Sequence, residues 1–314
     1  MTKALLTPKT LRGNWGTLLL PINNNDSIDL VRLSEEIGQL IDAGLDGIYS
    51  NGTAGEFHNQ TETEFDKVQQ VMAEKCRLAG MPFQIGASHP SPIISLERVR
   101  RCVALSPDAF QVILPDWVVA SPEEQVDFLS RIAEAAGDIP LVLYNPPHAK
   151  QVLTPSALAG LRSVVPSLIG VKLASGDASW FAEMRSLNID TSVFVPGHLL
   201  ATGVRERVAS GAYSNVACLS PRGSQAWWRM MSADLDKALG VQERILQFFA
   251  TCIVPFKNAG YSNPALDKFL AAVGGWGNVG TRLRWPYKWI DEKEVVAVRE
   301  VAMRLLPDFF LNVV

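Results

Sequence analysis

The stretch of sequence that decides the fold is LIGVKLA at residues 168–174, an apolar run that contains a single lysine, Lys172. The run has the length and composition of a strand buried in a parallel sheet. Lys172 follows Tyr144 by 28 residues, and Tyr144 itself ends an apolar run in YNPP at residues 144–147. This spacing is typical of one strand, one helix and two loops in a repeated βα unit.

Lys172 is also the first candidate for chemistry. A cation inside a buried strand costs folding energy unless it is paired or neutralised. A desolvated lysine has a lowered pKa and becomes a free amine that attacks carbonyl carbons. Tyr144, at the end of the preceding strand, could carry protons for that reaction. The alternative is a lysine whose stem is buried while its ammonium reaches water, and the run alone leaves both open.

Short apolar runs alternate with longer amphipathic stretches over the first two thirds of the chain. Thr61, Ser121 and Thr154 stand where capping residues begin helices, and residues 27–43 carry apolar side chains at helical spacing. We therefore predict an α/β fold, a (β/α)8 TIM barrel. The predicted strands are residues 15–20, 47–50, 83–86, 110–114, 141–144, 169–173, 192–195 and 213–219.

The last third of the chain has only helical patterns. Apolar stripes at helical spacing recur around Trp227, around Phe248 and over residues 295–306, and no linker precedes them. We predict a barrel over residues 1–222 and a C-terminal helical extension over residues 223–314, packed on the barrel as one structural unit.

Composition excludes several classes of protein. Lys and Arg (29) nearly balance Asp and Glu (32), the net charge is −3, and no basic run predicts a nucleic-acid partner. The apolar runs are shorter than the roughly 18 residues of a membrane span. The amino terminus has no secretion signal and the four cysteines are scattered, so we expect a cytoplasmic protein. The four histidines lack the spacing of metal ligands, and we expect no metal.

A glycine-rich segment, GTAGE at residues 52–56, follows the second predicted strand. Its glycines allow backbone N–H groups to turn toward an anion such as a carboxylate. In a βα barrel the loops at the carboxyl ends of the strands build the active site. A plain glycine turn before a helix is the alternative.

Three motifs occur in order at barrel spacing: GTAGE at 52–56, YNPP at 144–147 and GVK at 170–172. Together they resemble the dihydrodipicolinate synthase/N-acetylneuraminate lyase family of class I, Schiff-base aldolases. The resemblance begins at GTLLLP (residues 16–21) and reaches RLRWP (residues 282–286) near the carboxyl end.

The resemblance implies a role for each motif. Lys172 would form a Schiff base with the keto carbon of a 2-oxo acid such as pyruvate, and the iminium would act as the electron sink. Tyr144 would be the acid/base, and the Thr53 hydroxyl with the backbone of Ala54 and Gly55 would hold the substrate carboxylate. No cofactor would be needed. The family also implies a homo-oligomer, a tetramer built as a dimer of dimers.

Several positions depart from the family pattern. Ala54 stands where the family has a second hydroxyl residue, and a hydrogen bond to a charge contributes about 1.5–3 kcal/mol. Trp117 replaces a tyrosine of the synthases' proton relay, and Ala149 replaces their arginine for the second substrate. His148 or Lys150 could substitute for that arginine, or both could be solvated loop residues.

The predicted loops after strands seven and eight add further candidates. Gly197 fits the family, whereas Leu199 and Leu200 stand where the sugar lyases place acidic residues. His198 could bind a polar group of the substrate, act as a base, or merely cap the loop. We also expect Asn215 to face the cavity from strand eight.

Three functions follow from these observations. The first is a Schiff-base lyase for a 2-oxo acid, acting by aldol cleavage or by dehydration. If Trp117, Phe57, Leu199 and Leu200 line the mouth, its substrate has an apolar or aromatic part. The second is 4-hydroxy-tetrahydrodipicolinate synthase, which the departures at Trp117 and Ala149 disfavour. The third is a barrel that binds a small acid without catalysis.

Overall fold

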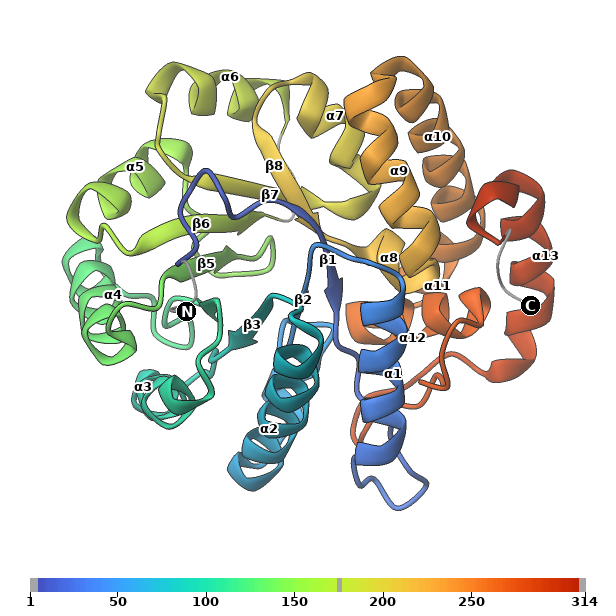
Figure 1. Cartoon of the computed structure of the whole chain (residues 1–314), viewed down its shortest axis with the longest axis horizontal. Coiled ribbons are helices and arrows are strands. Elements are labelled where there is room, and N and C mark those ends of the chain that lie inside the picture. The colour runs from blue at the N-terminus through green and yellow to red at the C-terminus, as the bar shows by residue number, and fades with distance from the viewer. Residues whose placement is uncertain (1–4, 174–176, 311–314) are drawn as a thin grey trace.

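The barrel sheet closes as the alternating pattern predicts. The computed structural model describes residues 5–173 and 177–310. Ala174, the last residue of the LIGVKLA run, lies outside the described residues, and so do the first four residues of the chain. Eight parallel strands pair in chain order, and β1 pairs with β8 to close the sheet (Figure 1). The strands are β1 Gly13–Thr17, β2 Gly47–Tyr49, β3 Phe83–Gly86, β4 Ala109–Val112, β5 Leu141–Asn145, β6 Leu168–Leu173, β7 Ser192–Pro196 and β8 Ala209–Tyr213.

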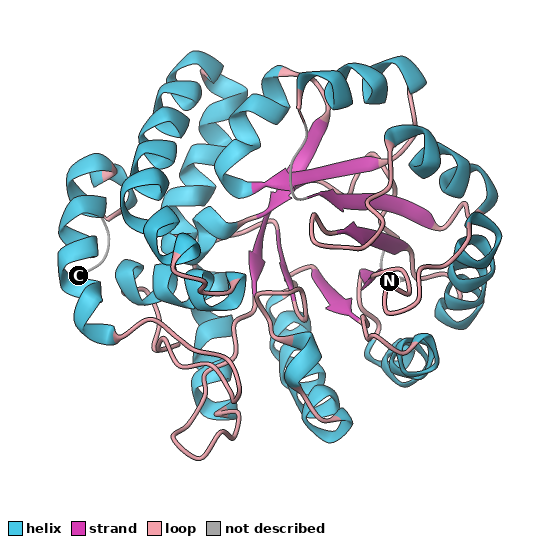
Figure 2. Cartoon of the chain, turned by 180° about the vertical axis from the view of Figure 1, so that it is seen from behind, coloured by secondary structure: helices cyan, strands magenta, loops and turns pink. Residues whose placement is uncertain are grey.

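Helices surround the barrel and extend beyond it on one side, as both views of the chain show (Figures 1 and 2). A π-helical turn at Phe249–Ile253 separates α10 from α11. The helices are α1 Leu30–Asp42, α2 Glu62–Ala79, α3 Pro92–Cys102, α4 Pro122–Ala136, α5 Pro155–Val164, α6 Ala178–Leu187, α7 Leu200–Arg205, α8 Asn215–Leu219, α9 Pro221–Ala233, α10 Leu235–Phe248, α11 Val254–Asn258, α12 Asn263–Gly274 and α13 Val295–Leu305.

The predicted eighth strand, residues 213–219, is wrong. The strand ends at Tyr213, and the apolar run after it is the short helix α8. The Ser214 hydroxyl accepts a hydrogen bond from the Ala217 N–H and so begins the helix there. Gly211 in the true strand approaches Gly13 so closely that a Cβ would lie 2.1 Å from the Gly13 carbonyl oxygen. The small residues of β8 therefore close the barrel, and they hid the strand from a search for bulky apolar residues.

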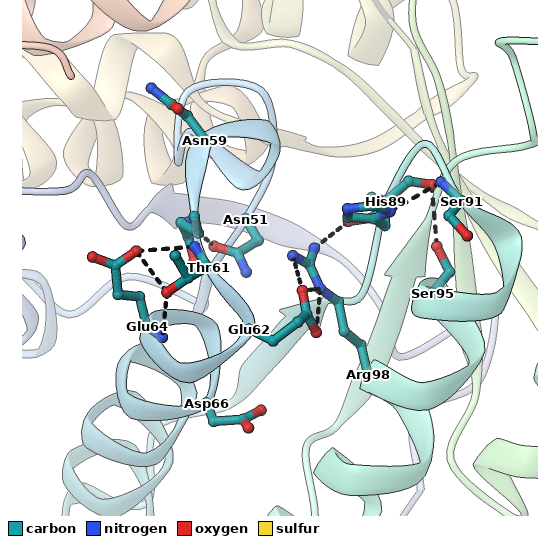
Figure 3. A network of polar contacts seen from close by, with 12 residues as sticks. Asn51, Asn59, Thr61, Glu62, Glu64, Asp66, His89, Ser91, Ser95 and Arg98 are labelled. Carbon is teal, nitrogen blue, oxygen red and sulfur yellow. Dashed lines mark hydrogen bonds and ion pairs between the residues drawn. The ribbon is translucent and has the colours of Figure 1, made fainter. Parts of the chain in front are cut away.

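The predicted helix starts at Thr61, Ser121 and Thr154 are confirmed. Thr61 and Ser121 each form a capping box with the glutamate three residues later, and Figure 3 shows the one at Thr61. The same figure shows the buried Arg98 of α3 bound to Glu62 of α2, with 2.8 Å between Nη2 and Oε1. Arg98 also donates to the Ser88 carbonyl, so one guanidinium fixes two helices and the loop after β3.

Two separate apolar clusters stabilise the fold. The larger one lies between the strands and the surrounding helices. The smaller one fills the barrel interior with aromatic rings, chiefly Trp15, Tyr49, Phe194 and Tyr213. The Phe194 and Tyr213 rings stack with their centroids 4.4 Å apart. Such a filled interior leaves the strand ends as the place for a binding site.

The boundary that we propose between barrel and extension, at residues 222 and 223, falls inside α9 near its start. Helix α9 packs against β1 of the barrel as well as against α10. Helix α13 lies at the outer edge of the molecule (Figure 1), whereas α12 packs against α8. Within the described ranges, none of the helices is long and apolar enough to cross a membrane.

Candidate active site

Lys172 lies near the carboxyl end of β6, next to Tyr144 on β5 in the parallel register. Neighbours in register point to the same side of a sheet, so both side chains enter the barrel mouth together. The Lys172 Nζ atom lies 4.2 Å from the centroid of the Tyr144 ring. The two residues that sequence reasoning favoured are therefore brought together.

Three tyrosine rings surround the Lys172 amine. Nζ donates a hydrogen bond to the Tyr49 hydroxyl at 3.2 Å, and it lies 5.5 Å from the Tyr213 ring centroid. Burial lowers the pKa of Lys172 to about 8, against the opposing effect of the Asp267 charge. At pH 7 a pKa of about 8 leaves roughly one-tenth of the amine unprotonated, far more than an ordinary lysine has. The half-buried amine thus lies among three aromatic rings with a pKa lowered toward neutrality.

Tyr144 forms the second element of the site with Thr53. Their hydroxyl oxygens lie 3.3 Å apart, so either one donates a hydrogen bond to the other. Burial raises the pKa of Tyr144, and the Thr53 hydroxyl partly opposes the shift. Tyr144 is consequently a neutral phenol that can give a proton and take it back.

The GTAGE segment bends tightly over the strand ends. A Cβ at Gly52 would lie 3.2 Å from Lys172 Nζ, and one at Gly55 would lie 2.8 Å from the Asn51 nitrogen. Within the described part of the chain, the N–H groups of Ala54 and Gly55 take part in no hydrogen bond. Two backbone donors beside the Thr53 hydroxyl can bind a carboxylate, and the buried Ala54 side chain adds no further hydrogen-bonding group.

A small cavity of about 80 Å³ adjoins Thr53 and Tyr144. It lies below the loops that follow β4 and β5, and most of its wall is apolar. Its polar lining includes Asp116, Gln125 and His148. The apolar lining residues are Phe57, Ile113, Leu114, Pro115, Val119, Leu143, Pro146 and Ala149.

Trp117 does not line this cavity, contrary to the sequence-based expectation. Its side chain is 82% exposed. Lys150 contacts the loop around Trp117: its ammonium donates to the Trp117 carbonyl at 2.6 Å, and its N–H donates to Asp116 at 2.8 Å. Lys150 therefore holds the loop, and His148 is left as the basic side chain of the cavity wall.

His198 and Asn215 bind each other. The backbone N–H of His198 donates to the Asn215 side-chain oxygen at 3.1 Å. The side-chain nitrogen of Asn215 lies 2.9 Å from His198 Nδ1. The imidazole stacks on Phe249 of the π-helical turn, and its burial lowers the pKa of His198. Asn215 is the first residue of α8, so its predicted place on strand eight was wrong, whereas its contact with the substrate stays a prediction.

Leu199 and Leu200, the residues predicted at the mouth after β7, do not line this cavity, and Leu199 is half-buried. Leu200 is fully buried in the outer core at the start of α7, so its apolar side chain serves packing. Gly197 is needed for close packing, because a Cβ there would lie 2.6 Å from the Ser214 hydroxyl oxygen. Of the predicted apolar mouth, Phe57 alone lines the cavity described above.

Sequence reasoning missed Tyr49 and Tyr213 as neighbours of the amine, although both belonged to predicted strands. It also missed the buried ion pair between Lys268 and Glu56, with 2.5 Å between Nζ and Oε1. Glu56 ends the GTAGE segment, so this pair ties α12 to the loop over the strand ends. The glutamate of GTAGE was the available signal in the sequence, but its partner lies more than 200 residues away.

Among the described residues, no cluster of three His, Cys, Asp or Glu side chains is placed to hold a metal ion.

Comparison with known proteins identifies the family. The family model described as the dihydrodipicolinate synthetase family matches residues 10–304. The chain belongs to this family. It is therefore an enzyme of the class I aldolases and lyases, and the non-catalytic binding barrel is not retained.

Similar proteins carry several names. A 4-hydroxy-tetrahydrodipicolinate synthase of Thermomicrobium roseum is 28% identical over 265 residues, covering 79% of this chain and 84% of that protein. A trans-O-hydroxybenzylidenepyruvate hydratase-aldolase of Sphingobium xenophagum is 24% identical over 316 residues and covers 95% of each chain.

A solved structure supports the fold. A prophage protein of the dihydrodipicolinic acid synthase family from E. coli K12, in complex with pyruvate, matches with a TM-score of 0.82 at 19% identity. The match covers 94% of this chain and 98% of that one. The fold is thus shared with that family member.

Proposed function

We propose that the enzyme forms a Schiff base between Lys172 and a 2-oxo acid of the pyruvate type, and then makes or breaks a bond two carbons from the imine nitrogen. The observation that carries the proposal is the juxtaposition of the Lys172 amine with the Tyr144 and Thr53 hydroxyl pair at the barrel mouth. An amine with a lowered pKa beside a neutral proton carrier is the equipment that imine chemistry requires.

The proposed reaction starts with the free amine. Its lone pair attacks the keto carbon, and the keto oxygen becomes the hydroxyl of a carbinolamine. Tyr144 passes a proton to that hydroxyl, which leaves as water, and the C–N double bond forms with its positive charge on nitrogen. The iminium then accepts the electron pair released when a C–C bond breaks, or when a C3 proton is removed before loss of a β-hydroxyl.

The substrate carboxylate is assigned to the GTAGE loop. The Thr53 hydroxyl and the free N–H groups of Ala54 and Gly55 would hold it near Lys172. Hydrogen bonds to a charged acceptor are stronger than neutral ones, so few donors suffice to orient the acid. Gly197, His198 and Asn215 remain candidates for contacts with the rest of the substrate.

The cavity below the β4 and β5 loops favours a substrate with an apolar or aromatic end. Its wall carries Phe57, Leu114 and Pro146, and Ala149 offers no charge to a second carboxylate. We therefore favour aldol cleavage, condensation or dehydration of such a 2-oxo acid. The named hydratase-aldolase relative is similar over nearly the whole chain, which agrees with this choice.

The second candidate is 4-hydroxy-tetrahydrodipicolinate synthase, because several similar proteins have that name. That reaction requires a site for aspartate semialdehyde, whose carboxylate needs a cationic or multiple-donor partner. His148 is the basic residue of the cavity wall available for it. Formation of product from pyruvate and aspartate semialdehyde would decide in favour of this candidate.

We further propose that the enzyme assembles as a homo-oligomer, a tetramer on the family expectation. The outer face of α3, α4 and the loop after β4 exposes apolar side chains, including Ile93, Trp117 and Val118, around a groove of about 370 Å³. Exposed apolar patches of this kind are typical of contact surfaces. Light scattering should give a multiple of 34.3 kDa, and Ile93→Glu should reduce the mass.

The experiment that tests the function is borohydride trapping with pyruvate, followed by peptide mass spectrometry. The expected result is a stable adduct on Lys172 that is absent from Lys172→Ala. A panel of larger 2-oxo acids, some with aromatic ends, then identifies the preferred substrate. If neither pyruvate nor any larger acid gives an adduct, the Schiff-base proposal is wrong.

A further inference from the structure

Glu56 and Lys268 form an ion pair that is buried in the interior of the protein. Their side chains are 1% and 0% exposed, and Lys268 Nζ lies 2.5 Å from Glu56 Oε1. Lys268 is on α12 of the C-terminal extension, whereas Glu56 is the last residue of the GTAGE loop. Burying two charges can cost more folding energy than their attraction returns, so stability alone does not explain the pair.

The GTAGE loop is bounded by two residues whose backbone conformation non-glycine residues rarely adopt. Asn51, which precedes the loop, and Glu56, which ends it, have φ angles of 52° and 51°, both in the left-handed region. The Glu56 N–H donates to the Thr53 carbonyl at 3.1 Å and so closes a tight turn. Such a backbone costs free energy and persists only where surrounding contacts hold it.

Two side chains from outside the loop hold it in this conformation. Gln60 follows the loop in the chain, and its amide donates to the Asn51 side-chain oxygen at 2.9 Å and to the Gly55 carbonyl at 3.0 Å. Lys268 holds the loop from α12, where its ammonium also donates to the Arg282 carbonyl at 2.7 Å. The ion pair therefore connects the C-terminal extension to the loop.

The same loop lies against the groups of the candidate active site. A Cβ at Gly52 would lie 3.2 Å from Lys172 Nζ, and one at Gly55 would lie 3.0 Å from the Leu18 carbonyl oxygen. The loop is thus closely packed between the amine and the residue that follows β1, and a shift of its far end would move the N–H groups of Ala54 and Gly55. A misplacement of about 1 Å can cost an enzyme about 10²-fold in rate.

We propose, on the basis of the Schiff-base function above, that the pair of Glu56 and Lys268 positions the GTAGE loop to bind the substrate carboxylate. Neither residue takes part in bond making or proton transfer, so both are positioning residues. Lys268 holds the loop through Glu56, and its charge also offsets that of the Glu56 carboxylate, which would otherwise repel an incoming 2-oxo acid. The donors assigned to the substrate carboxylate, which are the Thr53 hydroxyl and the N–H groups of Ala54 and Gly55, depend on this support.

The test is borohydride trapping at increasing pyruvate concentrations, in which Lys268→Met/Glu56→Gln is compared with the unaltered enzyme. This double variant leaves the net charge unchanged, so its pyruvate dependence reports the position of the loop. Arg98→Met/Glu62→Gln is the matched control, because it removes a pair with another fully buried cation, between α2 and α3 (Figure 3). Circular dichroism and thermal melting check that each variant is folded.

Glu56→Gln is the second variant, for use if the double variant does not fold. It keeps the Lys268 cation, whose attraction for an anion would by itself lower the pyruvate concentration that trapping requires. A rise in that concentration therefore still reports a displacement of the loop.

The expected result is a change in substrate binding rather than in the chemical step. The double variant should require about tenfold more pyruvate for half-maximal trapping, because the loop donors no longer converge on the carboxylate. Its limiting rate at saturating pyruvate should stay within about threefold, because Lys172 and Tyr144 are held by β6 and β5. The control should leave the half-maximal concentration within about twofold, although it too lowers the melting temperature.

Three results would refute the positioning role alone, with the unaltered enzyme still forming its adduct on Lys172. They are a half-maximal concentration within about twofold of the original, an equal rise in the control, and a limiting rate that falls by a larger factor than this concentration rises. Absence of any adduct in the unaltered enzyme, with pyruvate and with larger 2-oxo acids, would refute the Schiff-base function and the positioning role together.

Discussion

Lys172 is half-buried and Lys268 is fully buried, and the regions around the two lysines differ chiefly in whether the charge has a partner. Lys268 has a carboxylate at 2.5 Å and the Arg282 carbonyl at 2.7 Å, so its charge is matched inside the protein. Lys172 has a tyrosine hydroxyl at 3.2 Å and three ring faces, and within the described residues it has no ion-pair partner. Burial with a partner keeps the lysine charged, whereas burial without one lowers its pKa, as the proposed nucleophile requires.

The comparison can be tested first at Lys172, where we expect the largest effect. Lys172→Met should reduce catalysis by about 10⁴-fold or more, because no other residue can replace the covalent amine. The free energy of unfolding should stay the same or rise, since a poorly paired cation is replaced by an apolar side chain of similar length. Turnover and urea unfolding of the same preparation measure both quantities. A large loss of stability would mean that Lys172 is a structural residue after all.

The opposite result is expected at Lys268. Lys268→Met should destabilise the fold by about 3–5 kcal/mol, because it leaves the Glu56 carboxylate buried without its partner. Urea unfolding measures the change, and the Lys268→Met/Glu56→Gln double variant should recover part of it. Lys293→Met is the control, because Lys293 is 73% exposed and its pair with Asp291 is on the surface. That control should change stability by no more than about 0.5 kcal/mol.

Tyr144 tests the proton carrier beside the nucleophile. Tyr144→Phe should lower kcat by about 10²-fold, because the ring still packs over Lys172 while the hydroxyl that donates and accepts protons is gone. Borohydride should still trap the imine, but more slowly. Steady-state kinetics with the substrate found in the panel checks the first part and timed trapping the second. If kcat stayed within twofold of its original value, another group would have to be the acid/base.

Tyr49 gives the smallest expected effect. Its hydroxyl accepts a hydrogen bond from the Lys172 amine, and that bond favours the ammonium form. Tyr49→Phe should lower the pKa of Lys172 below its value of about 8, so the midpoint of adduct formation moves to lower pH. The change in kcat should be only about two- to fivefold, because the aromatic wall remains. A midpoint that moved to higher pH would contradict this account of the hydrogen bond.

The sequence by itself determined the architecture and singled out Lys172 as the candidate nucleophile. The alternation of apolar runs with capped amphipathic stretches predicted the barrel, because strands and helices differ in the period of their apolar residues. The capping boxes at Thr61 and Ser121 were local, so their sequence signals were sufficient. The order of GTAGE, YNPP and GVK pointed to Lys172, Tyr144 and Thr53, and the structure brings these three side chains together.

Only the tertiary structure decided which charges face each other. The partner of Glu56 and the anion acting on Lys172 both come from α12, and no sequence period links them to the barrel motifs. The eighth strand was misplaced for a related reason, because its small residues are explained by contact with Gly13 at the other end of the sheet. Trp117 was a candidate for the mouth of the site, but in a loop that Lys150 contacts its side chain is largely exposed. Local propensity specifies elements, whereas the electrostatics of a site depends on distances between residues that are remote in the chain.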